Sequence, residues 1–280
     1  MKRYVRKILR ILPDSIYIKL IFRKNIGYWP DLKTPKSFNE KLQWLKLHNR
    51  KAEYTEWVDK VKVKQYVSAK IGKEYIIPTL NVWNTVEEID FSVLPNQFVL
   101  KCNHDSYSTV ICKDKSKLDI EKTKAFLAKH MNNNFYWYGR EWPYKNVEPK
   151  VFAEKYMCDT PGSDLTDYKV LCFGGVAKFV EVHKDRFGSV HTQDIYDRNW
   201  RLTTITQGPT STKAEREPEY LDEMIKFSEM LSEGVPHLRV DWYVAGGKLY
   251  FGELTFFDGS GFAKFDNPED DLMLGSLIKL

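Results

Sequence analysis

The alternation of apolar and polar residues is clearest at 238–261, near the end of the chain. Two short runs rich in β-branched and aromatic residues flank a central Gly246-Gly247 pair there. This pattern predicts a β-hairpin. Its strands carry acids and an arginine among tryptophan, tyrosine and phenylalanine, so the hairpin is either a surface element with a solvated polar face or part of a site.

Two carboxylates of this hairpin can share a cation only if they lie on the same face of the sheet. Asp241 shares a face with Arg239, and Glu253 shares a face with Thr255, because side chains alternate along a strand. A two-residue loop would set Asp241 opposite Gly252, whereas a three-residue loop with a bulge would set it opposite Glu253. We predict the three-residue loop, since buried charges are costly unless they meet one another or a metal.

Helical periodicity dominates the first half of the chain. Residues 2–12 place apolar side chains on one face and basic side chains on the other, and a second apolar cluster at 16–22 carries Lys19 and Arg23. Such a basic amphipathic segment either lies on an anionic membrane surface or docks on the protein's own core. Ser37 and Glu40 form a capping-box signature that predicts a helix through about Leu47.

The other predicted elements give an α+β fold with one large domain or two smaller ones. Further helices are expected at 52–71, 86–91, 120–131, 218–231 and the end of the chain. Strands are expected at 97–104, 110–112, 150–157, 167–175 and 176–182, with a short strand or loop at 75–80 and a loop from 186 to 200. The polar loop 105–109 follows a strand that carries Lys101, which is a plausible arrangement for covering phosphates.

Composition and charge narrow the function classes. The chain has 280 residues and a net charge of +5, but five basic residues and no acid fall among the first ten, so no whole face is expected to bind nucleic acid. The four cysteines form no metal-binding pairs and are expected to be reduced thiols. Because no membrane span or signal peptide is predicted, we expect a cytoplasmic protein, peripheral on the inner membrane face if the basic segment meets lipid.

In combination, the motifs resemble the ATP-grasp fold, and in particular the TupA-like proteins of teichuronopeptide and capsular polysaccharide biosynthesis. The likeness is carried by Ser37-Phe38-Asn39-Glu40-Lys41, Val99-Leu100-Lys101-Cys102-Asn103-His104, Asp167-Tyr168-Lys169-Val170 and Phe251-Gly252-Glu253-Leu254-Thr255. The resemblance implies two α+β lobes that clasp a nucleotide. Residues 1–50 would be N-terminal helices and lead-in, and 51–280 the catalytic domain, with a small lobe at about 95–155.

The resemblance also implies roles for single residues, with ATP and Mg²⁺ as cofactors. Lysines matching Lys60 and Lys101 contact the nucleotide phosphates, the stretch matching Glu154, Lys155 and Tyr156 is the hinge at the adenine, and Ser106 lies in the phosphate loop. Residues matching Asp241 and Glu253 hold magnesium, with Thr255 where the family usually has asparagine. Arg239 is expected beside the transferred phosphate. Lys169 is expected to neutralise a phosphate or to pair with Asp167, and Arg186 to grip an acceptor carboxylate or to lie solvated in its loop.

One departure from the family pattern concerns the phosphate loop. Asp105 and Tyr107 stand where glycine is expected, since glycine lets backbone N–H groups approach phosphate. An aspartate facing phosphates would be repelled. We therefore expect either a reshaped loop or an Asp105 side chain that points away.

These features predict an ATP-grasp ligase that forms a carbon–nitrogen bond. ATP and Mg²⁺ would activate a uronic-acid or peptide carboxylate as an acyl phosphate, and an amine or amino acid would then displace phosphate. The partners would be an anionic glycan acceptor and an amine. The alternatives are a glycosyltransferase or a glycan kinase of the same pathway, or an inactive membrane-associated scaffold. No D-x-D motif supports the glycosyltransferase.

Overall fold

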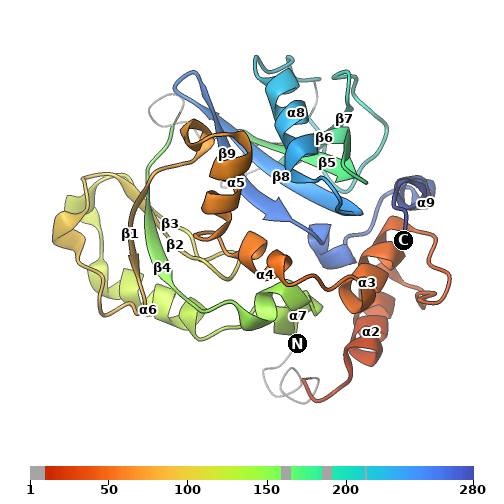
Figure 1. The fold of residues 1–280 in the computed structure, drawn as a ribbon, viewed down its shortest axis with the longest axis horizontal. Helices are drawn as coiled ribbons and strands as arrows, with labels where there is room; N and C mark the ends of the chain where they lie inside the picture. Colours follow the sequence, from red (N-terminus) through yellow and green to blue (C-terminus); the bar gives the residue numbers. More distant parts are fainter. Residues whose placement is uncertain (1–9, 159–164, 185–190, 212) are drawn as a thin grey trace.

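Two antiparallel sheets organise the chain in the computed structural model, which describes residues 10–158, 165–184, 191–211 and 213–280 (Figure 1). The smaller sheet has the strand order β1-β4-β2-β3 and the larger sheet the order β7-β6-β5-β8-β9. The strands are β1 (Thr79–Trp83), β2 (Phe98–Cys102), β3 (Val110–Cys112), β4 (Val151–Lys155), β5 (Asp167–Phe173), β6 (Val176–Lys184), β7 (Thr192–Asp197), β8 (His237–Ala245) and β9 (Lys248–Thr255). The predicted α+β class is confirmed.

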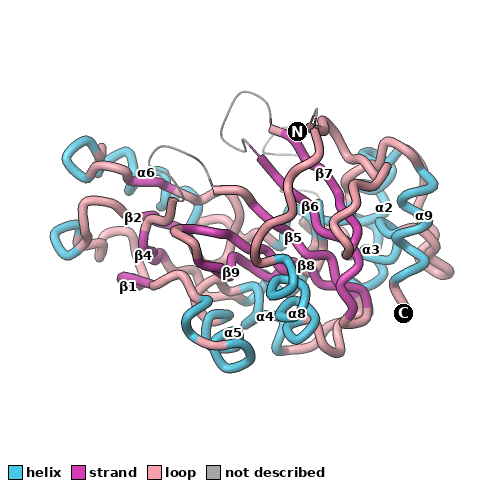
Figure 2. The backbone as a smooth tube through the Cα atoms, turned by 90° about the horizontal axis from the view of Figure 1, so that it is seen from above, coloured by secondary structure: helices cyan, strands magenta, loops and turns pink. Residues whose placement is uncertain are grey.

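Helices cover both sheets and link them. They are α2 (Asp14–Ile26), α3 (Phe38–His48), α4 (Glu53–Val58), α5 (Val63–Ile71), α6 (Ile120–Met131), α7 (Tyr136–Gly139), α8 (Leu221–Leu231) and α9 (Pro268–Leu277). Figure 2 shows α8 and α5 below the larger sheet and α2, α3 and α9 beyond its far end, while α6 packs on β2 of the smaller sheet. Among the described residues, no helix has the length and apolar character needed to span a membrane.

Each sheet has its own hydrophobic core. The core of the larger sheet takes in Trp242, which is fully buried and donates its indole N–H to Ser228 Oγ at 2.8 Å. It also takes in Phe38 and Leu42 of α3, so this helix packs as part of the larger lobe. The smaller core lies around Phe98 and Leu100 of β2. The smaller sheet begins at β1, before the start of the small lobe predicted at residue 95.

The capping box that opens α3 is confirmed. Ser37 Oγ accepts a hydrogen bond from the backbone N–H of Glu40, and the Glu40 carboxylate accepts one from the backbone N–H of Ser37. Two orphan N–H groups at the start of the helix are thereby satisfied. The helix then presents Asn39, Gln43 and Lys46 along one buried stripe, which becomes important at the site.

Three predicted elements were wrong. The helix expected at 52–71 is two helices, because Asp59 Oδ1 accepts hydrogen bonds from the N–H groups of Val61 and Lys62 and turns the chain between α4 and α5. The segment 86–91 forms no helix but only one hydrogen-bonded turn, from Ile89 N–H to Val86 O at 3.4 Å, and a 3₁₀ turn capped by Asp90 follows at Phe91–Val93. Part of the loop expected at 186–200 is the strand β7, whose edge position tolerates its polar residues. The helix expected at 2–12 lies largely outside the described residues.

The hairpin itself is confirmed, but its predicted loop was wrong. Ala245 pairs with Lys248, so the loop is the two-residue Gly246-Gly247, and both glycines have the positive φ of a type I′ turn. The extra residue lies within the strands instead, where the register shifts between Val240 and Trp242. This bulge puts Asp241 and Glu253 on the same face of the sheet, which is what the three-residue loop was invoked to achieve.

Candidate functional site

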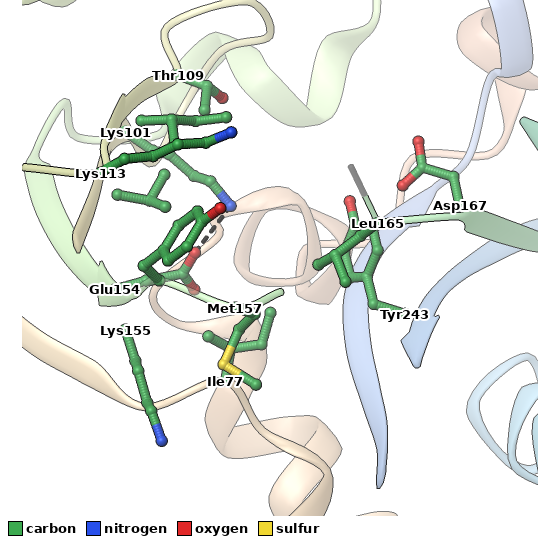
Figure 3. Close-up of a pocket in the computed structure, with 13 residues that line it drawn as sticks. Ile77, Lys101, Thr109, Lys113, Glu154, Lys155, Met157, Leu165, Asp167 and Tyr243 are labelled. Atoms are coloured by element: carbon green, nitrogen blue, oxygen red, sulfur yellow. Dashed lines mark hydrogen bonds and ion pairs between the residues drawn. The ribbon is translucent and has the colours of Figure 1, made fainter. Parts of the chain in front are cut away.

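Two adjoining pockets lie between the smaller sheet and the β8–β9 hairpin. The first, of about 870 Å³, is lined largely by apolar side chains, among them Ile77, Val99, Ile111, Met157 and Leu165. In Figure 3, Lys101 of the smaller sheet faces Tyr243 and Asp167 of the larger sheet across it. The second pocket, of about 630 Å³, is polar and is lined among others by Lys60, Ser106, Ser108 and Glu253. Both are lined by Lys101, Thr109, Glu154 and Tyr243, so the pockets form one continuous cleft.

On the small-sheet side, the cleft is marked by a carboxylate held between two lysines. Glu154 is buried on β4, and its oxygens lie 2.8 Å from Lys101 Nζ and 2.5 Å from Lys64 Nζ. Burial alone would raise the pKa of Glu154, but the two ammonium groups hold it below its ordinary value. Each lysine stays partly exposed, so each can turn toward a ligand in the cleft.

Lys60 enters the cleft because the chain breaks between α4 and α5. Its backbone N–H donates to Asn103 O at 3.0 Å, which ties the break to the end of β2. Its ammonium group donates to Asp105 O at 2.6 Å and lies 3.7 Å from Glu253 Oε2. Lys60 therefore spans from the polar loop of the smaller sheet to the hairpin of the larger one.

Asp105 is among the residues that line the polar pocket, but its carboxylate is bound by α6. Its Oδ2 lies 2.5 Å from Nδ1 of His130 on α6, and the side chain is almost fully buried. Tyr107 adopts a positive φ of 73° and is exposed. The loop thus presents backbone and hydroxyl groups to the pocket, while the carboxylate of Asp105 is bound by His130.

Across the larger sheet, charged residues form a row. Lys169 of β5 is paired in register with Glu181 of β6 on one side and with Asp241 of β8 on the other. Lys169 Nζ lies 2.6 Å from Asp241 Oδ2 and 3.6 Å from Asp167 Oδ2. Glu181 is buried, and burial raises its pKa. Lys169 therefore pairs with two acids of its own sheet, Asp241 and Asp167. The pair with Asp167 is one of the two alternatives expected from the sequence.

Arg239 gathers three carboxylates at the end of this row. Its guanidinium donates to both oxygens of Asp241, at 2.7 and 2.9 Å, in the bidentate geometry that suits arginine. It also contacts Asp258 and reaches Glu253 Oε1 at 3.4 Å. Burial would raise the pKa of Asp241, but Arg239 and Lys169 hold it well below its usual range.

Asp258 is presented by an unusual turn, in which Gly259, Ser260 and Gly261 all have positive φ. A non-glycine residue rarely adopts this conformation, so Ser260 must be held by its surroundings. Gln43 Nε2 donates to Gly261 O at 2.6 Å, and Ser260 Oγ contacts the buried Glu141 carboxylate. The stripe on α3 thus fixes the turn that brings Asp258 to Arg239.

Lys46 completes this support. Its ammonium group is wholly buried and donates to Gln43 Oε1 at 2.9 Å and to Gly139 O and Ser260 O, both at 2.7 Å. Burial lowers the pKa of Lys46 to about 7. Burying an amine costs free energy unless it is hydrogen-bonded, and the three acceptors of Lys46 offset this cost. Two of them are backbone carbonyls, so Lys46 holds the backbone at Gly139 and Ser260 in place.

The donors present fit a hard divalent cation at only one of the two predicted carboxylates. Glu253 is about 32% exposed, faces the polar pocket and offers carboxylate oxygens, the ligands Mg²⁺ prefers. The oxygens of Asp241 are bound closely by Arg239 and Lys169, at 2.7 and 2.6 Å, whereas those of Glu253 lie 3.4 and 3.7 Å from Arg239 and Lys60. Thr255 pairs in register with Arg239 rather than with an acid. No group of three His, Cys, Asp or Glu side chains poised for a metal occurs in the part of the chain described here.

A comparison with protein families finds that the TupA-like ATPgrasp model matches residues 40–279. The chain belongs to this family. The ATP-grasp family and the two-lobed α+β fold expected from the sequence are therefore confirmed. A comparison with functionally curated proteins finds no match.

Solved structures of ligases are similar to this chain at low sequence identity. D-alanine–D-alanine ligase from Helicobacter pylori has 14% identity and a TM-score of 0.47, with 87% of this chain and 70% of that one covered. The Bacillus anthracis enzyme complexed with ATP has 16% identity and a TM-score of 0.41, with 72% and 54% covered. The ligase PsnB with Mg and ADP has 12% identity and a TM-score of 0.44, with 85% and 65% covered. This TupA-like chain thus spans only about half the length of the B. anthracis enzyme, and the family assignment rests on the family model.

Most of the predicted site residues of this ATP-grasp chain meet at the cleft. Lys60, Lys101, Ser106, Glu154 and Glu253 line the polar pocket. Tyr156 lines the apolar pocket. Arg239, Asp241 and Lys169 form the buried ion-pair cluster beside it. Lys155 lines the apolar pocket as well, but its side chain extends away from Lys101 in Figure 3. Arg186 lies outside the described residues.

Sequence reasoning missed several charged residues of this ATP-grasp site, among them Lys64, Glu181 and Asp258. Lys64 shares Glu154 with Lys101, and it lies four residues after Lys60, which was a usable signal in the sequence. Glu181 sits opposite Lys169, a pairing that only the strand register reveals. Asp258 follows β9 in Asp258-Gly259-Ser260-Gly261, where the glycines indicated a special turn but not its direction.

Proposed function

We propose that this chain is an ATP- and Mg²⁺-dependent carboxylate–amine ligase of surface polysaccharide assembly. The observation that carries the proposal is the continuous cleft, in which an apolar pocket adjoins a polar pocket bordered by Lys60, Lys101 and Glu253. An apolar slot suits an adenine ring, and adjacent ammonium groups suit its phosphates. Family membership supports the same ligand, because the fold is named for grasping ATP.

The chain's own residues would divide the work between the two sheets. Lys60 and Lys101 would neutralise phosphate oxygens from the small-sheet side, and Arg239 would stabilise the transferred phosphate from the larger sheet. Glu253 would hold magnesium at the polar pocket, and the ion would offset phosphate charge when bound. Asp241 would orient Arg239 and Lys169, since it binds both.

The reaction would proceed in two transfers. A carboxylate oxygen of the acceptor would attack the γ-phosphorus, and the bond from that phosphorus to the bridging oxygen of ADP would break. An amine would then attack the acyl carbon, phosphate would leave, and the ammonium product would lose a proton to give the amide. The resemblance to TupA-like proteins supports a uronic acid or a glycan-linked peptide as the acid, and an amino acid or other amine as the nucleophile.

The proposal is tested by trapping the acyl phosphate. The protein is incubated with ATP, Mg²⁺, hydroxylamine and a panel of uronic acids and peptides, and we expect ADP, phosphate and a hydroxamate with at least one acid. A glycan kinase would instead leave phosphate on the product and form no hydroxamate. Thermal stabilisation by UDP-sugars but not by ATP would favour a glycosyltransferase.

A binding control separates an absent acceptor from an absent activity. Glu253→Gln is expected to weaken Mg²⁺-dependent ATP binding, whereas Glu148→Gln, an exposed acid away from the cleft, is expected to leave it unchanged. If no acid supports ADP formation and ATP affinity is the same in wild type and Glu253→Gln, the ligase proposal is rejected.

A further inference from the structure

The N-terminal helix α2 carries apolar side chains on both of its faces. The inner face packs on the protein through Tyr17, Ile18, Phe22 and Ile26. The outer face exposes Ile16 and Leu20, which are 47% and 41% exposed and lie one turn apart. A helix with this distribution has a second apolar surface to cover. Figure 1 shows α2 at the edge of the molecule, apart from both sheets.

The exposed apolar residues are surrounded by positive charge. Lys19, Arg23 and Lys24 lie on the same outer arc of the helix, and among the described residues neither Lys19 nor Lys24 has an acidic partner. The helix contains one acid, Asp14, whose carboxylate binds Arg50 at 2.9 Å and Tyr136 OH at 2.5 Å, on the inner side. The outer face is therefore cationic as well as apolar.

A hollow and an exposed tryptophan border this face. Lys19, Lys33 and His48 line the hollow together with Asp31, whose carboxylate is used by the N–H groups of Lys33 and Thr34. Trp29, just beyond the end of the helix, is 59% exposed. Tryptophan prefers the interface between water and membrane, and a basic hollow suits a lipid phosphate.

We propose that the outer face of α2 docks on an anionic phospholipid surface. Exposed aliphatic residues with lysines on both flanks match the chemistry of such a surface, in which acyl chains lie beneath negative headgroups. A protein partner with a purely apolar groove would leave the lysines unpaired. The inference is independent of the proposed ligase activity, because none of these residues lines either pocket of the cleft.

The test is co-sedimentation of the full chain with vesicles. The wild type is expected to bind vesicles of phosphatidylcholine with about one-third phosphatidylglycerol, and to remain in solution with phosphatidylcholine alone or at high salt. Each basic side chain near an anionic surface raises the affinity for the vesicles about fivefold. Lys19→Glu with Lys24→Glu should therefore lower this affinity at least about twentyfold. Lys178→Glu with Lys248→Glu makes the same change in net charge on exposed sites of the larger sheet and should have little effect.

A second pair of variants tests the apolar contribution. Ile16→Ser with Leu20→Ser is expected to reduce binding about tenfold, whereas Val93→Ser with Leu202→Ser, two residues elsewhere that are at least as exposed, should not. Wild-type protein that stays in solution with anionic vesicles overturns the proposal, as does equal binding by the α2 variants. If light scattering shows a wild-type dimer that Ile16→Ser with Leu20→Ser dissociates, a second copy covers this face instead.

Discussion

The two sides of the cleft hold their charges in different ways. On the larger sheet, Asp241 is buried between Arg239 and Lys169, which are themselves buried, so all three charges are matched within the protein. On the smaller sheet, Glu154 is buried but its partners Lys64 and Lys101 keep part of their surface in the cleft. The larger sheet thus offers a fixed array, whereas the smaller sheet offers cations that can exchange a protein carboxylate for a ligand.

Removing the buried acid on each side of the cleft, Asp241 or Glu154, should show the largest difference between the two sheets. Asp241→Asn removes the carboxylate that binds both buried cations and leaves Arg239 with Asp258 and Lys169 with Asp167, so we expect the free energy of unfolding to fall by about 3 kcal/mol. Glu154→Gln leaves lysines that reach water, so we expect a loss of only about 1–2 kcal/mol. Urea unfolding of both variants measures the difference.

Equal losses for the two variants would show that the sheets do not differ in this way. Asp222→Asn, at an acid in the exposed first turn of α8, serves as a control for the chemical change itself and should alter stability by less than about 1 kcal/mol.

Acid should act on the larger sheet through His237. This histidine is buried at the start of β8 between Phe38 and Phe173, and burial lowers its pKa to about 4 from the ordinary 6.5. Because the folded pKa is depressed, the unfolded chain binds more protons between pH 6.5 and 4. Stability is then present above pH 6.5 and falls by up to about 3 kcal/mol as pH drops to 4.

Unfolding by urea at a series of pH values checks this dependence. His237→Gln keeps a polar side chain but cannot be protonated, so its stability should vary less with pH over the same window, whatever its stability at neutral pH. A wild-type curve no steeper than that of His237→Gln would mean that other groups govern acid sensitivity.

The hairpin bulge tests how the fixed array is positioned. A Cβ at Gly252 would lie 2.8 Å from Tyr243 Cε2 and 3.1 Å from Asp241 O, so Gly252→Ala should cost about 2–3 kcal/mol and displace Asp241 and Glu253. Gly246→Ala meets nothing within 4 Å and should cost about 1 kcal/mol for its positive φ. Nucleotide affinity should fall only in Gly252→Ala. If nucleotide affinity fell by the same amount in Gly246→Ala, the turn rather than the bulge would determine the positions of Asp241 and Glu253.

The sequence allowed some of this arrangement to be predicted, because the signals are local. The capping box at Ser37 and Glu40 defines α3, and alternation defines the β8–β9 hairpin. Whether the extra residue falls in the loop or in the strand is not local. It depends on the close approach of Gly252 to Tyr243 across the pair, which composition does not encode.

Residues that act through pairing between distant segments were also beyond prediction. Glu181 matters because β6 aligns it with Lys169, and Lys46 matters because α3 packs on the turn after β9. Each looks like an ordinary residue of its own element. The break at Asp59, which sends Lys60 into the cleft, was hidden because the residues on both sides of it have helical periodicity.

Lys101 on the small-sheet side of the cleft is expected to matter little for stability but much for ATP binding. Lys101→Met leaves Glu154 paired with Lys64, so the free energy of unfolding should change by less than about 1 kcal/mol. The affinity for ATP with Mg²⁺, measured by calorimetry, should fall about tenfold, because a cation that faces the phosphates is lost. Lys155→Met is the matched control on β4, since its side chain lines the apolar pocket but extends away from Lys101 (Figure 3). If Lys155→Met weakened ATP binding as much as Lys101→Met does, the hinge lysine predicted from the sequence would be a ligand after all, and the exchangeable cations would not be confined to those that hold Glu154.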